Sequence, residues 1–283
     1  MNLTDKETLI NILKKNNIFL KKNLGQNFLV NKNIIEEILF SGEIKESDVI
    51  LEIGAGFGTL TVELAKYSKK VIAVEIDKRF EKILRENTRN FNNVEIIIGD
   101  ILKINLASLI APPYKIFGNL PYYISGTFLG EYLKKGPYAD LMVLMLQKEM
   151  AERITSKPGS KKFSPLSILL ELTYEVEVVC SVPSHFFFPI PEVDSLLLKF
   201  KYSPKFERIK NLSLFFNLIK SSFKYRRKYL LNNLKKEFPN LPWREVFERL
   251  NINFKERAEN LSLEKYIELS NLIEEYDKNS LLR

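Results

Sequence analysis

Four polar positions follow short apolar runs in the first half of the chain, and their types suit the binding of a nucleoside. Glu52–Gly58 reads EIGAGFG at the end of the first run, and Glu75 ends the second run, 21 positions after Gly54. Asp100 and Asn119 follow the third and fourth runs. Glycines let a loop approach a ligand closely, and an acidic side chain at this spacing can hold ribose hydroxyls. Because ligands of open parallel sheets bind at the carboxyl ends of the strands, we expect these residues to form one site.

The spacing of the glycines limits which nucleotide this loop can bind. A dinucleotide-binding turn reads G-x-G-x-x-G, whereas this loop reads G-x-G-x-G after the acidic Glu52. The phosphate-binding pattern G-x-x-x-x-G-K-[ST] is absent from the sequence. An acidic loop suits a ligand with an amine and a sulfonium and no phosphate, and the loop resembles the first motif of class I S-adenosylmethionine-dependent methyltransferases. The alternative is a tight turn with no ligand, which requires four strand ends to agree by chance.

The segment Asn119–Tyr122 (Asn-Leu-Pro-Tyr) predicts chemistry on an exocyclic amine. The lone pair of such an amine is delocalised into the base, so acceptors that bind its hydrogens must favour a pyramidal nitrogen. The side-chain oxygen of Asn119 can be one acceptor and a main-chain carbonyl the second, with Pro121 restricting the residue before it. Tyr122 can stack on an extruded base. The motif resembles that of amino-group methyltransferases acting on adenine or cytosine; alone, it could be an ordinary turn.

The elements that must position these residues alternate between strand-like and helix-like stretches, which predicts a mostly parallel α/β sheet with helices on both faces. The expected strands are 49–53, 71–76, 94–98, 114–118, 141–146, 176–182 and 196–202, and the expected helices between them are 58–67 and 78–90. After Pro204 the pattern is helical, at 212–223, 226–238, 242–250 and 262–275. We therefore expect a catalytic domain over 1–203, with an N-terminal helical extension over 1–20, and a small all-helical domain over 204–283.

Composition excludes several other classes of protein. The sequence has one cysteine, Cys180, and one histidine, His185, which cannot build an internal disulfide, a usual zinc site or a Ser-His-Asp enzyme. No apolar run is long enough for a membrane span, and residues 1–15 lack a signal-peptide core. We expect a cytoplasmic protein that needs no metal.

The basic residues are concentrated in one segment of the chain. Residues 196–250 contain 14 Lys and Arg against 4 Asp and Glu, so this segment has a net charge of +10, whereas the whole chain has +8. A polyanion could neutralise such a surface by releasing counterions. The alternative is a solvated basic helix face, so charge alone favours a nucleic-acid surface here without establishing it.

Several further motifs occur in a fixed order with those already described. They are Lys22–Leu29 (KNLGQNFL), Leu146–Glu149 (LQKE), Phe187–Ser195 (FFPIPEVDS), Phe223–Lys228 (FKYRRK) with Asn232–Leu234, and Arg257–Ser262 (RAENLS). Together they resemble the ribosomal RNA adenine dimethyltransferase family, and within it the bacterial group that acts on small-subunit (16S) rRNA. The resemblance runs from about Lys21 to the C-terminal helices. Ala55 stands where many members have proline and Tyr229 where many have threonine, and neither change affects the chemistry.

The resemblance implies N6,N6-dimethylation of two adjacent adenines in a hairpin loop near the 3′ end of 16S rRNA in the small subunit, with a role in subunit biogenesis. The methyl donor would be S-adenosylmethionine, leaving S-adenosylhomocysteine, and the enzyme would be a monomer. The implied cofactor-binding residues are Gln26, Asn27, Leu29, Gly54, Gly56, Glu75, Ile76, Asp100, Ile101 and Asn119. The implied catalytic residues are Asn119, Leu120 through its carbonyl, Pro121, Tyr122 and Phe187, and the implied RNA-binding residues are Lys224, Arg226, Arg227 and Lys228.

Phe187 is assigned by the family pattern Phe-x-Pro-x-Pro-x-Val-x-Ser and would close the far face of the base. Its competing interpretation is core packing, which we expect for at least one of Phe186, Phe187 and Phe188. Three other functions stay open. They are a 23S rRNA methyltransferase of the macrolide-resistance type, a DNA adenine methyltransferase, and a mainly non-catalytic ribosome assembly factor.

Overall fold

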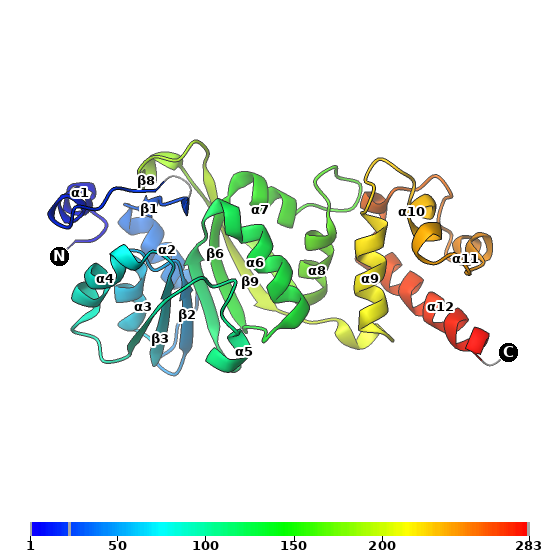
Figure 1. The fold of residues 1–283 in the computed structure, drawn as a ribbon, viewed down its shortest axis with the longest axis horizontal. Helices are drawn as coiled ribbons and strands as arrows, with labels where there is room; N and C mark the ends of the chain where they lie inside the picture. The colour runs from blue at the N-terminus through cyan, green and yellow to red at the C-terminus, as the bar shows by residue number, and fades with distance from the viewer. Residues whose placement is uncertain (1, 22–23, 282–283) are drawn as a thin grey trace. The chain divides into compact units, whose positions relative to one another are not determined.

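A computed structural model of the chain describes residues 2–21 and 24–281, with the side chains of Tyr122 and residues 277–281 outside the description. The chain divides into two compact units (Figure 1). The first comprises Met1–Ala151 and Val176–Tyr202, and the second comprises Glu152–Glu175 and Ser203–Arg283. Among the described residues, no helix combines the length and the apolar composition that crossing a membrane requires.

The first unit is built on a seven-stranded sheet in the order β4-β3-β2-β5-β6-β9-β7. The strands are β2 (Val49–Ile53), β3 (Lys70–Glu75), β4 (Val94–Ile98), β5 (Lys115–Asn119), β6 (Leu141–Gln147), β7 (Tyr174–Val182) and β9 (Ser195–Tyr202). Strands β2 to β6 run parallel, and β9 joins β6 in the antiparallel sense. The central strands are almost continuously apolar and buried, as is typical of parallel strands covered on both faces.

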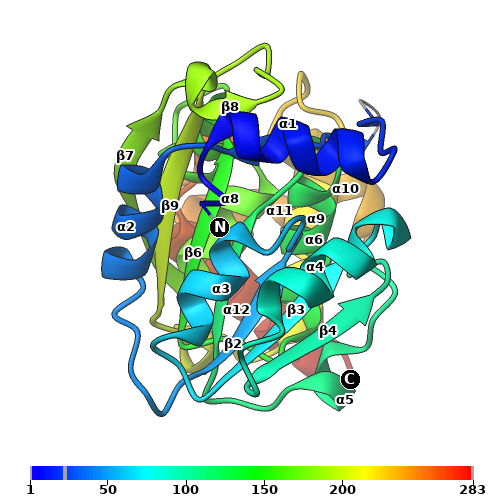
Figure 2. The same cartoon turned by 90° about the vertical axis from the view of Figure 1, so that its left-hand side faces the viewer.

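Helices cover the sheet on both faces (Figure 2). Three helices on one face, α2 (Lys32–Ser41), α3 (Thr59–Ala65) and α4 (Glu81–Thr88), share a hydrophobic cluster with the inward side chains of the sheet. Strands β3 and β4 are added on one side of β2, whereas β5 and β6 are added on its other side and remain parallel to it. The right-handed crossover from β5 to β6 therefore puts α6 (Tyr122–Lys135) on the opposite face. The short helix α5 (Leu106–Leu109) connects β4 to β5.

An N-terminal arm, which comprises the described residues 2–21 and 24–29, packs above the carboxyl edge of the sheet. Figure 2 shows its helix α1 (Lys6–Lys15) crossing the molecule. Apolar residues of α1 share a second cluster with Phe57 and Phe80, which follow β2 and β3. Phe28 contacts both rings, with centroids 4.4 Å from Phe57 and 5.4 Å from Phe80. The arm then forms β1 (Phe28–Leu29), which pairs with β8 (Phe187–Phe188), so two distant segments meet beside the sheet.

The second unit is helical. Its elements are α8 (Pro165–Thr173), α9 (Leu212–Ser222), α10 (Leu230–Glu237), α11 (Trp243–Arg249) and α12 (Leu263–Leu281), and α7 (Lys148–Ile154) spans the point where the chain enters this unit. Helix α9 packs against α10 and α12, and α12 also contacts α8 and α11. The buried Asn233 fixes the turn between α9 and α10, because its amide donates to the carbonyls of Ser222 and Tyr225.

The structure agrees with the sequence on the seven strands of the main sheet and differs on other elements. Helices α2, α6 and α8 and the pair β1–β8 were not anticipated. The expected helix over 226–238 begins only at Leu230, because residues 223–228 form turns. We expected the catalytic domain to extend over 1–203, but Glu152–Glu175 lies in the second unit. The reason is that α8 buries most of its side chains in that unit and packs against α12.

Two glycines of the first unit predict opposite effects of the same substitution. A Cβ at Gly118 in β5 would lie 2.6 Å from the carbonyl oxygen of Ile53 on the neighbouring strand, where the backbone cannot yield, whereas a Cβ at Gly130 in α6 would meet nothing within 4 Å. We expect Gly118→Ala to lower the free energy of unfolding by about 1–3 kcal/mol. Gly130→Ala should raise it by about 0.5–1 kcal/mol. Urea unfolding followed by circular dichroism measures both, and equal effects would contradict the packing described for β5.

Candidate active site

One cavity lies at the carboxyl ends of four neighbouring parallel strands and beneath the N-terminal arm. Its lining includes Glu52–Phe57 from the end of β2 and the loop after it, Glu75 and Ile76 from the end of β3, Gly99–Ile101 after β4, Asn119 and Pro121 from the end of β5, and Leu24–Leu29 from the arm. The four positions that the sequence placed at strand ends therefore lie at one site. Every residue that we expected to contact the cofactor lines this cavity.

The glycine loop is fastened to the end of β3 by the carboxylate of Glu75, which is 7% exposed. Its Oε2 accepts a hydrogen bond of 2.8 Å from Gly56 N–H, and its Oε1 accepts one of 2.8 Å from Asp77 N–H. Gly54 has φ +82°, a conformation that favours glycine, and this conformation lets the backbone line the cavity directly. Burial raises the pKa of the Glu75 carboxyl, whereas the two N–H donors act in the opposite direction.

Glu52 contributes a second buried carboxyl group to the cavity lining. It is 2% exposed, and among the described residues no group forms a hydrogen bond with its Oε2. Burial raises the pKa of Glu52 to about 7, whereas Thr61 lowers it and the nearby Glu75 raises it further. A buried carboxylate oxygen without a partner is costly, so Oε2 is suited to a cationic or hydrogen-bond-donating ligand. The sequence analysis associated this acidic loop with a ligand that carries an amine and a sulfonium, but it did not name Glu52 among the cofactor-binding residues.

Asn119 is the last residue of β5, and its amide contacts the N-terminal arm. Its Nδ2 donates to the carbonyl oxygen of Asn27 at 2.9 Å. This bond sets the orientation of the amide plane, so the oxygen is the end that can accept a hydrogen bond from a ligand. The next residue, Leu120, has a buried side chain, and its N–H donates to the carbonyl of Met145. Pro121 then begins α6 as its N-cap residue.

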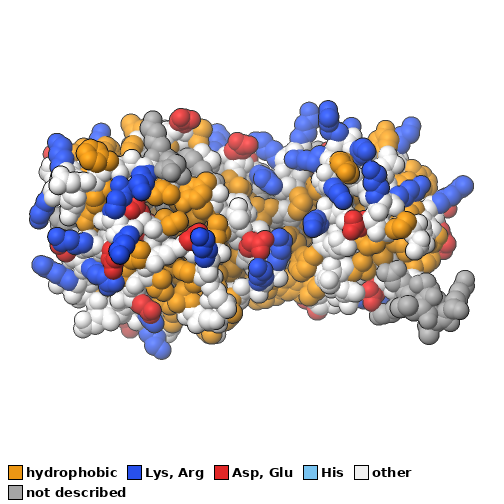
Figure 3. All heavy atoms as spheres, viewed as in Figure 1, with side chains coloured by type: hydrophobic (Ala, Val, Ile, Leu, Met, Phe, Trp, Pro, Cys, Tyr) orange, Lys and Arg blue, Asp and Glu red, His pale blue; other side chains and the backbone are white. Residues whose placement is uncertain are grey.

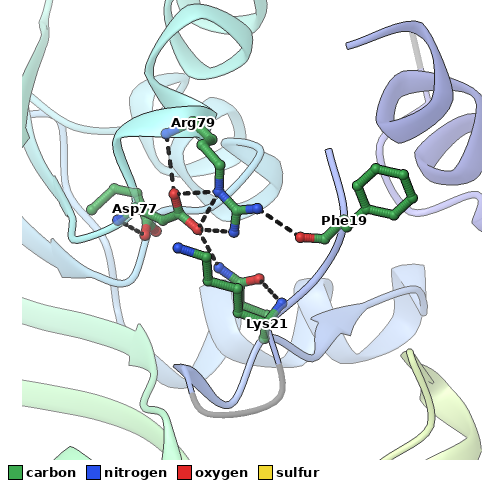
Figure 4. Close-up of polar contacts among 6 residues, drawn as sticks. Phe19, Lys21, Asp77 and Arg79 are labelled. Atoms are coloured by element: carbon green, nitrogen blue, oxygen red, sulfur yellow. Dashed lines mark hydrogen bonds and ion pairs between the residues drawn. The ribbon is translucent and has the colours of Figure 1, made fainter. Parts of the chain in front are cut away.

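Gln26 lines the cavity, but its side chain is already engaged. Its Nε2 donates to Asp77 Oδ2 at 2.7 Å, and its Oε1 accepts from Lys21 N–H at 2.7 Å (Figure 4). Asp100 accepts a hydrogen bond from Leu102 N–H through Oδ1, which fixes the carboxylate at the end of β4. Both ends of the Gln26 amide therefore form hydrogen bonds within the protein, whereas the acidic residues at the strand ends keep acceptor capacity for a ligand.

The aromatic residues expected to contact a base lie in different surroundings. Phe187 is 3% exposed, packs in the core cluster with Leu29 and Val182, and is not among the described residues that line the cavity. The reason is its pairing with Leu29 across β1 and β8, which directs the ring into the core. The side chain of Tyr122 lies outside the described residues. Tyr123 was missed by the sequence analysis; it is 47% exposed and lines the cavity.

The basic residues expected to bind RNA lie in the second unit, in the turns between α9 and α10. Figure 3 shows Lys and Arg side chains gathered over this part of the unit. Lys224, Arg227 and Lys228 are exposed, and the Lys228 ammonium lies 4.8 Å from the centre of the Tyr225 ring. Arg226 differs from them, because its guanidinium donates to the carbonyl oxygens of Lys161 at 2.6 Å and Phe163 at 3.1 Å. It therefore stabilises the loop before α8.

Comparison with known proteins shows the family. A family model described as ribosomal RNA adenine dimethylase matches residues 17–275. A curated relative from Clostridioides difficile (strain 630), named "Ribosomal RNA small subunit methyltransferase A", is 38% identical over 276 residues, which cover 93% of this chain and 93% of the relative.

Solved structures show the same fold. A dimethyladenosine transferase from Plasmodium falciparum matches with a TM-score of 0.75 and 30% identity, over 89% of this chain and 98% of that one. The 23S rRNA methyltransferase ErmE matches with a TM-score of 0.68 and 24% identity, over 86% of this chain and 98% of that one, and this likeness supports the fold alone. The expected class I methyltransferase sheet with a C-terminal helical unit is thus confirmed. The chain therefore belongs to the ribosomal RNA adenine dimethylase family of enzymes.

Proposed function

We propose that this enzyme transfers methyl groups from S-adenosylmethionine to N6 of two adjacent adenines in a hairpin loop near the 3′ end of 16S rRNA, two groups to each adenine. The name of the curated relative at 38% identity supports the small-subunit substrate. The observation that carries the proposal is the Asn119 Nδ2 bond to the Asn27 carbonyl at 2.9 Å, because it presents an oriented acceptor beside the cavity. The resemblance to a 23S rRNA methyltransferase is one of fold and supports no separate function.

The residues that line the cavity fit S-adenosylmethionine, which supplies an electrophilic methyl group when bound. Glu52 has a buried oxygen without a partner, which suits the positive charge of an amine or a sulfonium. Glu75 is held at the end of β3 by two main-chain donors and retains acceptor capacity for ribose hydroxyls. Asp100 and Ile101 line the cavity at the end of β4, where an adenine ring would lie.

The protein's part in transfer is orientation of the target amine. Asn119 Oδ1 would accept a hydrogen bond from one N–H of the amine, and the main-chain carbonyl of Leu120 would accept one from the other, so that the nitrogen lone pair is free to attack. Pro121 restricts the backbone of Leu120 and so limits the directions that this carbonyl can take. Positioning of this kind can supply most of the rate enhancement when the leaving group is already activated. Tyr123 offers an exposed ring face at the cavity for stacking a flipped base.

The second unit supports binding to the ribosomal particle. Within it, residues 203–250 have 12 basic and 4 acidic residues, and Lys224, Arg227 and Lys228 are exposed beside Tyr225 and Tyr229. Cationic side chains neutralise phosphates, and exposed aromatic rings can stack on unpaired bases. We further propose that the enzyme acts as a monomer in the bacterial cytoplasm, where its substrate is assembled. Mass mapping of rRNA adenines after incubation of small subunits, and separately of large-subunit rRNA, with labelled cofactor tests the substrate directly.

Asn119→Ala should lower kcat for methylation of small subunits by at least about 100-fold, because it removes an acceptor aimed at the reacting amine. Binding of S-adenosylhomocysteine should change far less, since Glu52, Glu75 and Asp100 remain. Asn119→Asp is the matched control, because it keeps an acceptor oxygen while it replaces the donor to Asn27 with a charged acceptor, so it should retain more activity than Asn119→Ala. Single-turnover methylation and calorimetric binding separate the two effects. An Asn119→Ala enzyme with the wild-type rate would refute the assignment.

The raised pKa of Glu52 predicts that cofactor affinity rises with pH. A cationic ligand favours the ionised carboxylate, so Kd should fall about tenfold per pH unit up to the pKa of about 7 and then level off. The stability of the free enzyme depends on pH in the opposite direction, because protonated Glu52 favours folding. The folded state holds the proton more tightly than the unfolded chain, so the contribution of Glu52 to stability is lost as pH rises from about 4.5 to about 7.

Glu52→Gln tests this dependence. The variant should show a flatter plot of log Kd against pH than the wild type. Its free energy of unfolding should also fall less between pH of about 4.5 and about 7. Because titration of the ligand itself is common to both proteins, the difference between the two plots isolates Glu52. Calorimetry between pH 5.5 and 8.5 with S-adenosylmethionine measures it. Identical plots would show that Glu52 does not face the charged part of the ligand.

The basic turn predicts two different outcomes for neighbouring arginines. Changing Arg227 and Lys228 together to alanine should reduce the slope of log affinity against log salt by up to about 2 for small-subunit binding, with little loss of stability. Arg226→Ala should instead lower the free energy of unfolding by about 1–3 kcal/mol, because the carbonyls of Lys161 and Phe163 lose their donor. An unchanged salt slope in the paired variant would locate the RNA surface elsewhere.

A further inference from the structure

A buried acidic side chain lies just outside the cavity, in the turn that follows Glu75. The side chain of Asp77 is 4% exposed, and Asp77 is not among the described residues that line the cavity. Its carboxylate accepts hydrogen bonds from Arg79 Nε at 2.8 Å and from Gln26 Nε2 at 2.7 Å, and it also pairs with Arg79 Nη2. Such a carboxylate, held between two side-chain donors, is a strong point of attachment.

Both donors lead to the N-terminal arm. Arg79 Nη1 donates to the carbonyl oxygen of Phe19 at 2.7 Å, and Gln26 Oε1 accepts from Lys21 N–H at 2.7 Å (Figure 4). Figure 4 shows the Arg79 guanidinium beside the Asp77 carboxylate, from which it extends to the main chain of Phe19. One carboxylate on the sheet edge is therefore connected to the arm at Phe19 through Arg79 and at Gln26 directly.

The arm, in turn, contacts the residue proposed to act on the amine. Asn27 follows Gln26 directly, and its main-chain carbonyl accepts the hydrogen bond from Asn119 Nδ2 at 2.9 Å. Residues Phe28 and Leu29 then pair with β8. A displacement of Gln26 would move the Asn27 carbonyl, and the Asn119 amide would lose the partner that sets its orientation.

We propose that Asp77 is a positioning residue for methyl transfer, because its carboxylate holds the N-terminal arm through Gln26 and Arg79 so that the Asn27 carbonyl orients the Asn119 amide. This inference rests on the function proposed above. It also gives Gln26 a role other than cofactor contact, since both ends of its amide are used within the protein. The hydrogen bonds and the ion pair with Arg79 lower the pKa of Asp77 to about 2, so the attachment holds throughout the neutral range.

Asp77→Asn is the primary test. It preserves the size of the side chain and can keep the acceptor for Arg79 N–H, but it turns an amide donor toward the donors of Gln26 and Arg79. We expect kcat/KM for small subunits to fall by about 10- to 100-fold, since a small misplacement of a reacting group can have an effect of this size. Hydrogen–deuterium exchange over residues 18–30 should accelerate, most clearly at the Lys21 amide that Gln26 binds.

The reciprocal double variant Asp77→Asn with Gln26→Glu tests whether the contact itself matters. Glu at position 26 can accept from the new amide at position 77 and from Lys21 N–H, and it restores a negative charge near Arg79. The double variant should therefore recover slow exchange and most of kcat/KM, whereas Gln26→Glu alone opposes two carboxylates and should not. Recovery of this kind is not expected if Asp77 serves only general stability.

Asp48→Asn is the matched control in the same unit. Asp48 also forms a shielded ion pair, with Lys115 at 2.8 Å, but it precedes β2 at the opposite edge of the sheet. It should lower thermal stability without changing kcat/KM or exchange over residues 18–30. If Asp77→Asn behaves like this control, with unchanged kcat/KM, the inference is overturned, whether or not exchange accelerates.

The measurements also separate this inference from the proposed function. Exchange over residues 18–30 and binding of S-adenosylhomocysteine require no RNA, and wild-type transfer to small subunits is measured first. A wild type that transfers no methyl group to small subunits would refute the proposed function and, with it, the role of Asp77 in transfer. A normally active wild type with an unaffected Asp77→Asn variant would refute only the positioning role.

Discussion

The carboxylate of Glu75 is the contact around which the active site is arranged. A carboxylate with so little exposure requires hydrogen-bond donors, and the protein supplies two main-chain N–H groups, from Gly56 and Asp77. These bonds draw the glycine loop after β2 and the turn after β3 to the same point. The turn then presents Asp77 to the N-terminal arm, and the arm presents Asn27 to Asn119. Satisfying one buried charge therefore places groups from four separate segments of the chain.

The acidic character of the cavity limits the charge of the ligands that it favours. Glu52 and Glu75 are both buried, and burial raises the pKa of each. Two neighbouring carboxyl groups disfavour phosphate and favour a ligand with positive charge. The loop therefore has the backbone geometry of a nucleotide-binding turn, but its carboxyl groups favour a cationic ligand where such turns usually bind phosphate. The same acidic pocket would be unfavourable for the phosphates of RNA. The basic surface lies instead in the second unit.

The two units differ in what stabilises them and in what they offer to RNA. The first unit depends on an apolar parallel sheet, with the site at one edge. The second is a set of helices whose exposed turns hold Lys224, Arg227 and Lys228, while Arg226 Nη2 donates to the main-chain carbonyls of Lys161 and Phe163. Adjacent residues of one basic run thus differ in their contacts, because Arg226 Nη2 is held by main-chain carbonyls.

The sequence by itself determined the main strands, the residues at their carboxyl ends and the family, because apolar runs, glycine spacing and ordered motifs are local patterns. It identified Glu75, Asp100 and Asn119 correctly as neighbours, since parallel strands share an edge. Only the tertiary structure decided the contacts between distant segments. Gln26 and Asp77 are 51 positions apart, Phe187 is buried by pairing with Leu29, and α8 belongs to the second unit. Such contacts depend on which surfaces pack together, and no local pattern encodes that choice.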